Sequence, residues 1–268
     1  MIIEFVKMEG LGNDYVYVDT DSFPVSNPSE LSCWVSDRHF GIGSDGLVLI
    51  SRSQDADFSM RIFNADGSEA QMCGNASRCI GKYVYERGLT DKTVITLDTL
   101  SGVKTLLIHP DASGLVRSVT VSMGNFGGGD SLAVRLPDGR VIEGTVIDMG
   151  NPHFVILADD YPGISPEKEG PMLEKHPIFP EGTNVEFVRL ISPSKVRMRV
   201  WERGSGVTMA CGTGACATAA ALCLKGLTGS ECEVVMDGGA LTVRCDPSSR
   251  EISMEGPANF VFEGRMEI

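Results

Sequence analysis

The segments Met72-Cys73-Gly74-Asn75 and Ala210-Cys211-Gly212-Thr213 decide how this chain is organised. Cys211 follows Cys73 by 138 residues, and a fixed offset that recurs along a chain indicates an internal duplication. The sequence therefore predicts two similar halves, each with one cysteine just before a helix. The same offset aligns Arg199-Val200-Trp201 with Arg61-Ile62-Phe63, Gly150-Asn151 with Gly12-Asn13, and Gly226-Leu227-Thr228 with Gly88-Leu89-Thr90.

Length and composition describe a folded, acidic protein. The 268 residues have room for one large domain or two of about 130 residues, and the repeat favours two. Hydrophobic residues make up 42% of the chain and charged residues 22%, which is ordinary for a globular fold. The net charge of −13 argues against nucleic acid or an anionic membrane as a partner, and it is compatible with a small zwitterionic substrate.

Targeting signals are not expected. The first seven residues lack the basic segment and apolar core of a secretory signal, and the apolar run 215–224 is too short to span a bilayer. Eight cysteines in 268 residues are too few for a disulfide scaffold, which favours a reduced, cytoplasmic setting.

The pattern of apolar residues predicts the same order of elements in both halves. Helical spacing from Gly74 to Arg87, with Gly88 as the terminating residue, predicts the first main helix. The matching helix after Cys211 is composed mostly of small residues and ends at Gly226, and a helix that is apolar nearly all round is a buried one. Strands are predicted at 2–7, 15–19, 47–51, 58–63, 93–98, 102–109 and 118–123, and at 146–149, 154–158, 185–190, 196–201, 234–236, 241–245 and 251–254.

We expect an α+β protein with two pseudo-symmetric domains, each a curved mixed or antiparallel, barrel-like sheet wrapped around a central helix. The first domain comprises residues 1–117 and the second residues 118–261. The tail 260–268 has no repeat partner, and we expect its strand 262–268 to return to the first domain and pair with the N-terminal strand.

One glycine motif has a structural interpretation. Gly41-Ile42-Gly43-Ser44-Asp45-Gly46 matches the G-x-G-x-x-G string of dinucleotide sites. That fingerprint must follow a strand and open a helix, whereas this segment leads into a strand. The motif therefore predicts a glycine turn that lets the backbone make a close approach.

The two cysteines suggest acid–base chemistry. A thiol at a helix N-terminus lies near unpaired N–H groups and the positive end of the helix dipole, so we expect the pKa of Cys73 and Cys211 to be lowered. The same N–H groups can hold a carboxylate. If both thiols flank one α-carbon, one thiolate removes its proton while the other thiol protonates the opposite face. That geometry predicts stereoinversion of an amino acid.

The helix dipole alone is too weak for catalysis. It contributes at most about 2 kcal/mol, whereas enzymes lower barriers by at least about 8 kcal/mol. Preorganised N–H donors to the carboxylate contribute about 2.7–4 kcal/mol each. Gly74, Asn75, Gly212 and Thr213 are placed to supply them.

Other polar residues share the repeat. Asn64 and Glu202 each precede a cysteine by nine residues, and His153 lies in the turn that matches Asn13-Asp14, which favours a place in the same cleft. No lysine context indicates a pyridoxal Schiff base, so no cofactor is expected. The cysteine spacing does not fit zinc, so no metal is expected either. The remaining cysteines are interpreted as buried apolar residues: Cys33, Cys79, Cys216, Cys223, Cys232 and Cys245.

Together these segments resemble the pyridoxal-independent diaminopimelate epimerases over nearly the whole chain. The resemblance rests on Gly10-Leu11-Gly12-Asn13-Asp14, Arg61-Ile62-Phe63-Asn64-Ala65-Asp66-Gly67-Ser68, Cys73-Gly74-Asn75, Met149-Gly150-Asn151-Pro152-His153, Glu202-Arg203-Gly204 and Ala210-Cys211-Gly212-Thr213-Gly214-Ala215-Cys216. It implies conversion of LL-diaminopimelate to the meso form, the step that feeds lysine and peptidoglycan synthesis, and it implies a homodimer.

The resemblance also implies residue roles. Cys73 and Cys211 would be the acid/base thiols, and His153 and Glu202 would tune their protonation. Gly74, Asn75, Gly212 and Thr213 would hold the reacting carboxylate, while Asn13, Asn64, Asn151, Asn184, Glu202 and Arg203 would bind the substrate's other amino and carboxyl groups.

Two departures from the family pattern bear on specificity. Some members have Gln at the position of Gly46, and many have Gly at the position of Ala76. A racemase of another amino acid, or a non-catalytic binding protein on the same fold, stays open as an alternative, although a binding protein would not need both cysteines.

Overall fold

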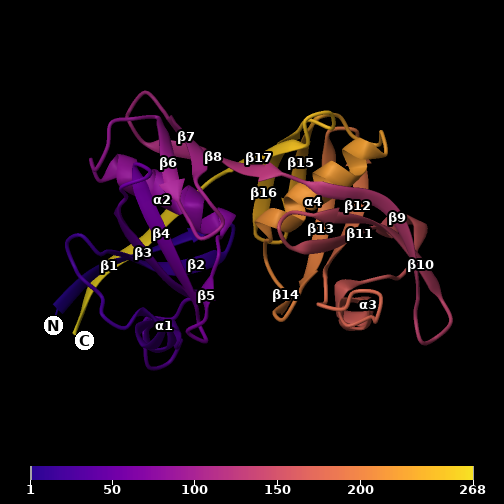
Figure 1. Cartoon of the computed structure of the whole chain (residues 1–268), viewed down its shortest axis with the longest axis horizontal. Helices are drawn as coiled ribbons and strands as arrows, with labels where there is room; N and C mark the ends of the chain where they lie inside the picture. Colours follow the sequence, from indigo (N-terminus) through magenta and orange to yellow (C-terminus); the bar gives the residue numbers. More distant parts are fainter. Residues whose placement is uncertain (1, 268) are drawn as a thin grey trace. The chain divides into compact units, whose positions relative to one another are not determined.

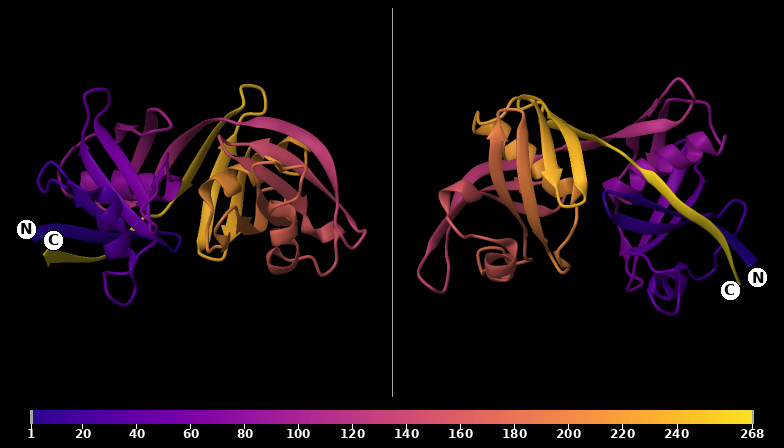
Figure 2. Two further views of the ribbon diagram at one scale, coloured as in Figure 1. Left: turned by 60° about the horizontal axis from the view of Figure 1, so that its bottom comes forward. Right: turned by 180° about the vertical axis from the view of Figure 1, so that it is seen from behind.

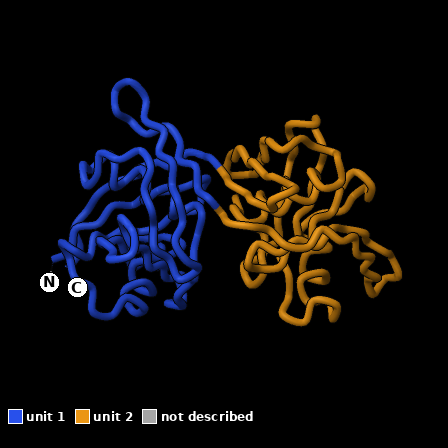
Figure 3. Tube along the Cα trace, turned by 45° about the horizontal axis from the view of Figure 1, so that its top comes forward, with its two compact units in different colours: residues 1–122, 255–268 blue, residues 123–254 orange. Residues whose placement is uncertain are grey.

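The computed structural model describes residues 2–267, which form two units, both α+β (Figures 1 and 3). Unit 1 runs up to Ser122 and takes in the segment from Glu255 onward; unit 2 comprises Met123–Met254. The chain enters unit 2 inside strand β8 (Val116–Asn125) and returns inside β17 (Glu251–Gly256). Both crossings fall within strands, so no turn residue marks them. The predicted domain ranges 1–117, 118–261 and 262–268 have their boundaries a few residues from these crossings. Residues 1 and 268 of those ranges lie outside the described part.

Unit 1 is one curved mixed sheet. β1 lies between β18 and β2 and is antiparallel to both. β2 pairs with β3 in parallel, and β4 pairs with β6 in parallel, whereas β3–β4, β6–β7 and β7–β8 are antiparallel. Its elements are β1 (Ile2–Gly10), β2 (Asn13–Asp19), α1 (Pro28–Ser36), β3 (Gly46–Arg52), β4 (Phe58–Asn64), β5 (Glu69–Ala70), α2 (Gly74–Glu86), β6 (Val94–Asp98), β7 (Lys104–Pro110) and β18 (Asn259–Glu267).

Unit 2 repeats this order. β11 pairs with β12 in parallel, as β2 does with β3, and β13 pairs with β15 in parallel, as β4 does with β6. Its elements are β9 (Gly127–Arg135), β10 (Val141–Asp148), β11 (Pro152–Leu157), the short helix η1 (Ala158–Asp160), α3 (Pro166–Glu174), β12 (Asn184–Ser192), β13 (Lys195–Glu202), β14 (Gly206–Val207), α4 (Gly212–Leu224), β15 (Glu231–Met236) and β16 (Gly239–Cys245).

Each sheet lies between two helices. In unit 2 the buried helix α4 contacts β9–β13, β15 and β16, and in unit 1 the corresponding helix α2 contacts β1 and β7 (Figure 1). The shorter helices α1 and α3 cover the other face of their sheets. Leu31 and Val35 of α1 pack with Val16, Leu47 and Phe63. The α+β prediction with a central helix in each half is confirmed.

The tail has a repeat partner that the sequence analysis missed. β18 pairs antiparallel with β1, and β9 pairs antiparallel with β10 in the same way, so β9 is the counterpart of β18 (Figure 2). The sequence analysis assigned no strand to β9, because its first residues, Gly127-Gly128-Gly129-Asp130, have the composition of a turn. In Figure 2 the yellow β18 lies along the indigo β1.

Glycines end both main helices and permit close backbone contacts. Gly88 and Gly226 have φ of 67° and 68°, the left-handed conformation that terminates a helix. In the glycine motif, a Cβ on Gly41 would lie 2.0 Å from Trp34 O, so the prediction of a close backbone approach is confirmed there. Among residues 2–267, no helix has both the length and the apolar character needed to cross a membrane.

Candidate functional site

Cys73 is the N-cap residue of α2 and is partly exposed. Its extended backbone (φ −136°, ψ 120°) places the thiol beside the first helical turn, where backbone N–H groups lack intrahelical acceptors. Asn13 Oδ1 lies 3.4 Å from Cys73 Sγ and 3.3 Å from Asn75 Nδ2. Asn13 Nδ2 donates to Asp45 Oδ2 at 2.9 Å, which turns the amide oxygen of Asn13 toward the thiol.

Asn64 ends β4, opposite Gly46 of β3. Its side chain donates to Ser68 Oγ at 3.0 Å in the turn that follows. A Cβ at Gly46 would lie 2.1 Å from Phe63 O and 2.8 Å from Tyr15 Cε1, so in this backbone arrangement glycine is required by packing. The departure at Gly46 therefore has a structural reason in this chain.

Cys211 is the N-cap residue of α4 and is buried. Gly214 N donates to its sulfur at 3.4 Å, and Thr213 Oγ1 lies 3.6 Å from it. Burial raises the pKa of the Cys211 thiol well above its usual value, and the negative charges of Glu202 and Glu186 raise it further. The expectation of a lowered pKa is wrong for Cys211, because desolvation and two carboxylates outweigh the helix N-terminus.

Glu202 ends β13 and lies within hydrogen-bonding reach of Cys211. Burial raises the pKa of the Glu202 carboxyl, while hydrogen bonds from Thr208 and Cys211 partly oppose this shift. Glu202 is thus a carboxylate of raised proton affinity in contact with the thiol. Such a group can take or return the thiol proton.

His153 lies at the start of β11 and is fully buried. Its Nε2 lies 3.0 Å from Asn151 Oδ1, and its Nδ1 lies 2.7 Å from Glu186 Oε1. Asn151 is the repeat partner of Asn13, whose amide oxygen contacts Cys73. Each unit therefore has an asparagine at this position, and the second unit adds the imidazole of His153 and the carboxylate of Glu186.

Asn184 and Arg203 form a second contact of the same unit. Asn184 Nδ2 donates to Pro152 O at 2.9 Å, and Arg203 N donates to Asn184 Oδ1 at 2.9 Å. The Arg203 side chain is exposed and donates from Nη1 to Glu181 O at 3.1 Å. Asn184 thus joins the turn before His153 to the segment that carries Arg203.

Similarity to known proteins identifies a family for this chain. The family model described as diaminopimelate epimerase matches residues 5–126 and 145–261. The chain belongs to the diaminopimelate epimerase family. Family members act as isomerases, and the resemblance deduced from the sequence motifs is confirmed.

Individual relatives cover the full length. The chain is 56% identical to a diaminopimelate epimerase of Phocaeicola vulgatus, with 99% of both chains covered, and 49% identical to one of Methanococcus maripaludis, with 99% and 100% covered. Among solved structures it resembles a PhzF-family phenazine biosynthesis protein of Bacillus anthracis (TM-score 0.73, 17% identity, 100% of both chains). It also resembles a hydroxyproline epimerase of Agrobacterium vitis (TM-score 0.71, 17% identity, 98% and 92% covered). These two likenesses concern the fold.

Three polar residues of the epimerase half-sites were missed by sequence reasoning. Glu186 stands alone in the apolar run Val185-Glu186-Phe187-Val188, and a charged residue inside a buried strand was the available signal. Asp45 was passed over as part of the glycine turn. Thr208 gave no signal in the sequence, because its role depends on the strand that brings Glu202 beside it.

The repeat partner of Ala76, the second position that departs from the family pattern, is a glycine. Ala76 is fully buried in the first turn of α2, and the matching residue in α4 is Gly214. A Cβ on Gly214 would lie 2.8 Å from Glu186 Oε1. The buried carboxylate of the second unit therefore requires glycine there, whereas the first unit has Val48 in place of Glu186.

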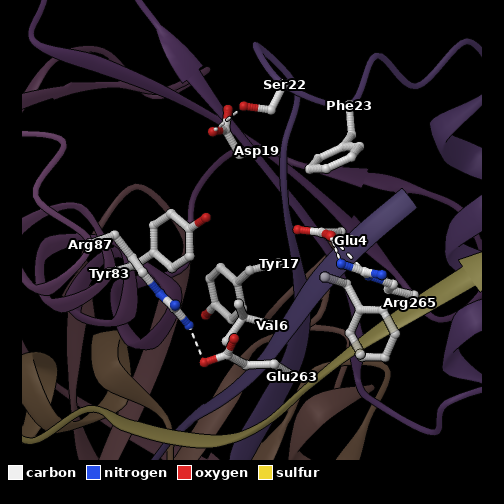
Figure 4. A pocket seen from close by; sticks show the side chains of 12 residues that line it. Glu4, Val6, Tyr17, Asp19, Ser22, Phe23, Tyr83, Arg87, Glu263 and Arg265 are labelled. Atoms are coloured by element: carbon white, nitrogen blue, oxygen red, sulfur yellow. Dashed lines mark hydrogen bonds and ion pairs between the residues drawn. The ribbon is translucent and has the colours of Figure 1, made fainter. Parts of the chain in front are cut away.

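A separate cavity of about 470 Å³ lies in unit 1 at the opposite end of α2 (Figure 4). Tyr83 and Arg87 line it from the C-terminal end of the helix, about 20 Å along the axis from the end that carries Cys73. Four of its charged side chains form two ion pairs: Arg87 with Glu263, and Arg265 with Glu4 at 2.7 Å. The cavity contains none of the predicted site residues.

Proposed function

We propose that the protein converts LL-diaminopimelate to meso-diaminopimelate by proton transfer at one α-carbon. The observation that carries the proposal is the repeated thiol: both units present a cysteine at the N-cap of their central helix, within a family of diaminopimelate epimerases. The product serves lysine and peptidoglycan synthesis. We place the reaction in the cytoplasm, on the basis of the sparse cysteine content, and expect a homodimer by analogy with the family.

The two thiols act on opposite faces of the same α-carbon. In one direction the Cys73 thiolate removes the α-proton while the Cys211 thiol donates its proton to the other face, so the inverted product leaves with a thiol at Cys73 and a thiolate at Cys211. The raised pKa of Cys211 fits the donor role, because the group then carries its proton at neutral pH. In the reverse direction Cys211 must first lose that proton.

Glu202 and His153 exchange protons with Cys211. The Glu202 carboxylate contacts the thiol directly, and burial raises its pKa, which makes it a stronger base toward the thiol proton. His153 is held near the same unit's site through Asn151. These residues restore the protonation state that each direction of the reaction requires.

The first-turn N–H groups of Gly74, Asn75, Gly212 and Thr213 bind the reacting carboxylate. Removing the α-proton moves negative charge into this carboxylate, so the N–H donors bind more strongly in the transition state than in the ground state. The substrate's amino and carboxyl groups are bound by Asn13, Asn64, Asn151, Asn184, Glu202 and Arg203, with Arg203 at the distal carboxylate.

The test is deuterium incorporation at the substrate α-carbon in heavy water. We expect LL-diaminopimelate to gain deuterium during turnover, and we expect Cys73→Ala and Cys211→Ala each to lower the inversion rate by at least about 10³-fold. Far-UV circular dichroism of both variants controls for folding. Inversion at the wild-type rate in either variant contradicts the two-thiol scheme, and preferred turnover of another L-amino acid in a panel contradicts the substrate.

A further inference from the structure

Glu186 is a fully buried carboxylate that the proposed proton transfer does not use. Its neighbours in β12, Val185 and Phe187, belong to the apolar core beneath α3, so Glu186 points to the other face of the sheet, toward α4. A Cβ on Gly214 would lie 2.8 Å from Glu186 Oε1 and 3.3 Å from Cys211 Sγ. The carboxylate therefore lies against the helical turn that carries the thiol.

The environment of Glu186 is unfavourable for a charge. Its Oε1 contacts His153 Nδ1 at 2.7 Å, both side chains have no exposed surface, and within residues 2–267 its Oε2 has no hydrogen-bond partner. Burying an ion costs several kcal/mol, and a well-packed apolar pair is often as stable as a buried ion pair. The contact with His153 therefore does not explain, by fold stability, why an acidic residue occupies this position.

The first unit shows that the fold does not require this acid. At the repeat positions of Glu186 and His153 it has Val48 and Tyr15, which are also buried. The strand registers agree, since Tyr15 lies opposite Gly46 as His153 lies opposite Asn184. The same sheet is therefore built with an aliphatic side chain where the second unit has Glu186.

We propose that Glu186 is a positioning residue: it accepts the Nδ1 hydrogen of His153 and thereby directs Nε2 of the imidazole to Asn151 in the Cys211 half-site. The assignment extends the proposed function to one more residue. It rests on that function for the reaction, and on the structure alone for the state of His153.

Hydrogen-bonding rules give the reason. The ionised form of the Glu186 carboxylate can only accept a hydrogen bond, so it requires a hydrogen on Nδ1; burial raises the pKa of Glu186, and the contact with His153 opposes that shift. The amide of Asn151 can present either its oxygen or its NH₂ group to Nε2. Glu186 thus fixes the hydrogen on Nδ1 and leaves Nε2 to face Asn151.

Glu186 also affects the thiol. The charged and titratable groups around Cys211 come from several elements: His153 from β11, Glu186 from β12 and Glu202 from β13. The negative charge of Glu186 raises the pKa of Cys211, with a smaller effect than burial and Glu202. Removing it should let the Cys211 thiolate form at lower pH.

The first experiment needs no substrate. Nitrogen-15 NMR of histidine-labelled protein, with His153 assigned by loss of its signals in His153→Asn, reports which ring nitrogen carries hydrogen. In the wild type we expect Nδ1 to carry a hydrogen. In Glu186→Val, which copies the first unit, we expect this preference to be lost. A wild-type His153 with an unprotonated Nδ1 overturns the proposal.

The second experiment separates positioning from packing. Glu186→Gln keeps the size and one acceptor oxygen but removes the charge, so it serves if Glu186→Val fails to fold. We expect its kcat to fall at least about 10-fold, with KM within about threefold of the wild type, and its pH profile to move toward lower pH. A profile that overlays the wild type overturns the proposal.

The matched control is Glu169→Gln, which neutralises another buried carboxylate of unit 2. Glu169 lies on α3, pairs with Arg140 at 2.9 Å and contacts none of the half-site residues. We expect it to change stability and leave the pH profile in place. An equal profile shift in this control contradicts the role of Glu186. Failure of the two-thiol scheme would appear separately, as inversion by Cys73→Ala, and would leave the NMR result unaffected.

Discussion

Both units contain single cysteine residues whose thiols are buried. Burial raises the pKa of Cys79 to about 12 and of Cys232 to about 11. Between its pKa values in the unfolded and folded states, such a thiol keeps its proton in the folded state and loses it in the unfolded state. The unfolded state then binds fewer protons than the folded state. Stability must therefore fall above about pH 9, up to the folded-state pKa.

Alkaline destabilisation can be assigned to one residue with Cys79→Ala. We expect the wild type to lose up to about 1.4 kcal/mol of stability per pH unit from Cys79 between pH 9 and pH 11, and the variant to lose correspondingly less. Urea unfolding at pH 8, 9, 10 and 11 measures the slopes. Cys33→Ala removes an exposed thiol and is the control. Equal slopes in wild type and Cys79→Ala would refute the assignment.

The central helices α2 and α4 occupy equivalent places but are packed differently. α4 contains a run of small residues, Ala215-Cys216-Ala217-Thr218-Ala219-Ala220-Ala221, all of which are buried. α2 carries Lys82 at the position that matches Ala220, and its amine bonds to Glu86 and to Val116 O. The sheet of unit 2 therefore surrounds α4 on more sides than its counterpart surrounds α2.

A larger side chain in α4 should be costly. We expect Ala220→Leu to destabilise the protein by about 1–3 kcal/mol, because Ala220 has no exposed surface and the interior is close-packed. The same substitution at the exposed Ala112, in a surface turn of unit 1, should change stability by less than about 0.5 kcal/mol. Thermal unfolding of both variants gives the comparison, and equal effects would show that α4 is loosely packed.

At the scale of the whole molecule, unit 2 is one continuous segment and unit 1 is assembled from both ends of the chain. The returning segment is bound to unit 1 by strand pairing with β1 and by side-chain contacts. Ser118 Oγ donates to Glu255 Oε1 at 2.7 Å, and Arg78 Nε donates to Pro257 O at 3.1 Å. Unit 1 thus needs residues that follow unit 2 in the chain.

This connectivity predicts different behaviour of the two fragments. We expect residues 123–254 to fold alone, because the strands and core of unit 2 lie within that segment. Residues 1–122 should not fold, because β1 would lose β18 and present an unpaired edge. Circular dichroism and NMR dispersion of the fragments measure this. A well-dispersed spectrum from residues 1–122 would contradict the prediction, and adding residues 255–268 through a linker should restore folding.

The sequence by itself determined the duplication, the order of the elements and the two cysteines at helix starts. The helical spacing after Cys73 and the terminating glycines Gly88 and Gly226 can each be read within a short window, and the repeat offset needs only a comparison of the chain with itself. The strand β9 was missed because the glycine-rich start of the strand resembles a turn, although pairing with β10 decides its conformation.

The tertiary structure alone decided the electrostatics of the half-sites. Cys73 and Cys211 have the same local sequence context, but Cys211 is buried beside Glu202 and Glu186, and the strands that carry these acids meet only in the folded sheet. The pKa of a thiol depends on desolvation and on charges within a few ångströms. Both come from residues distant in sequence, so the helix N-terminus predicted the position of Cys211 correctly and the direction of its pKa shift wrongly.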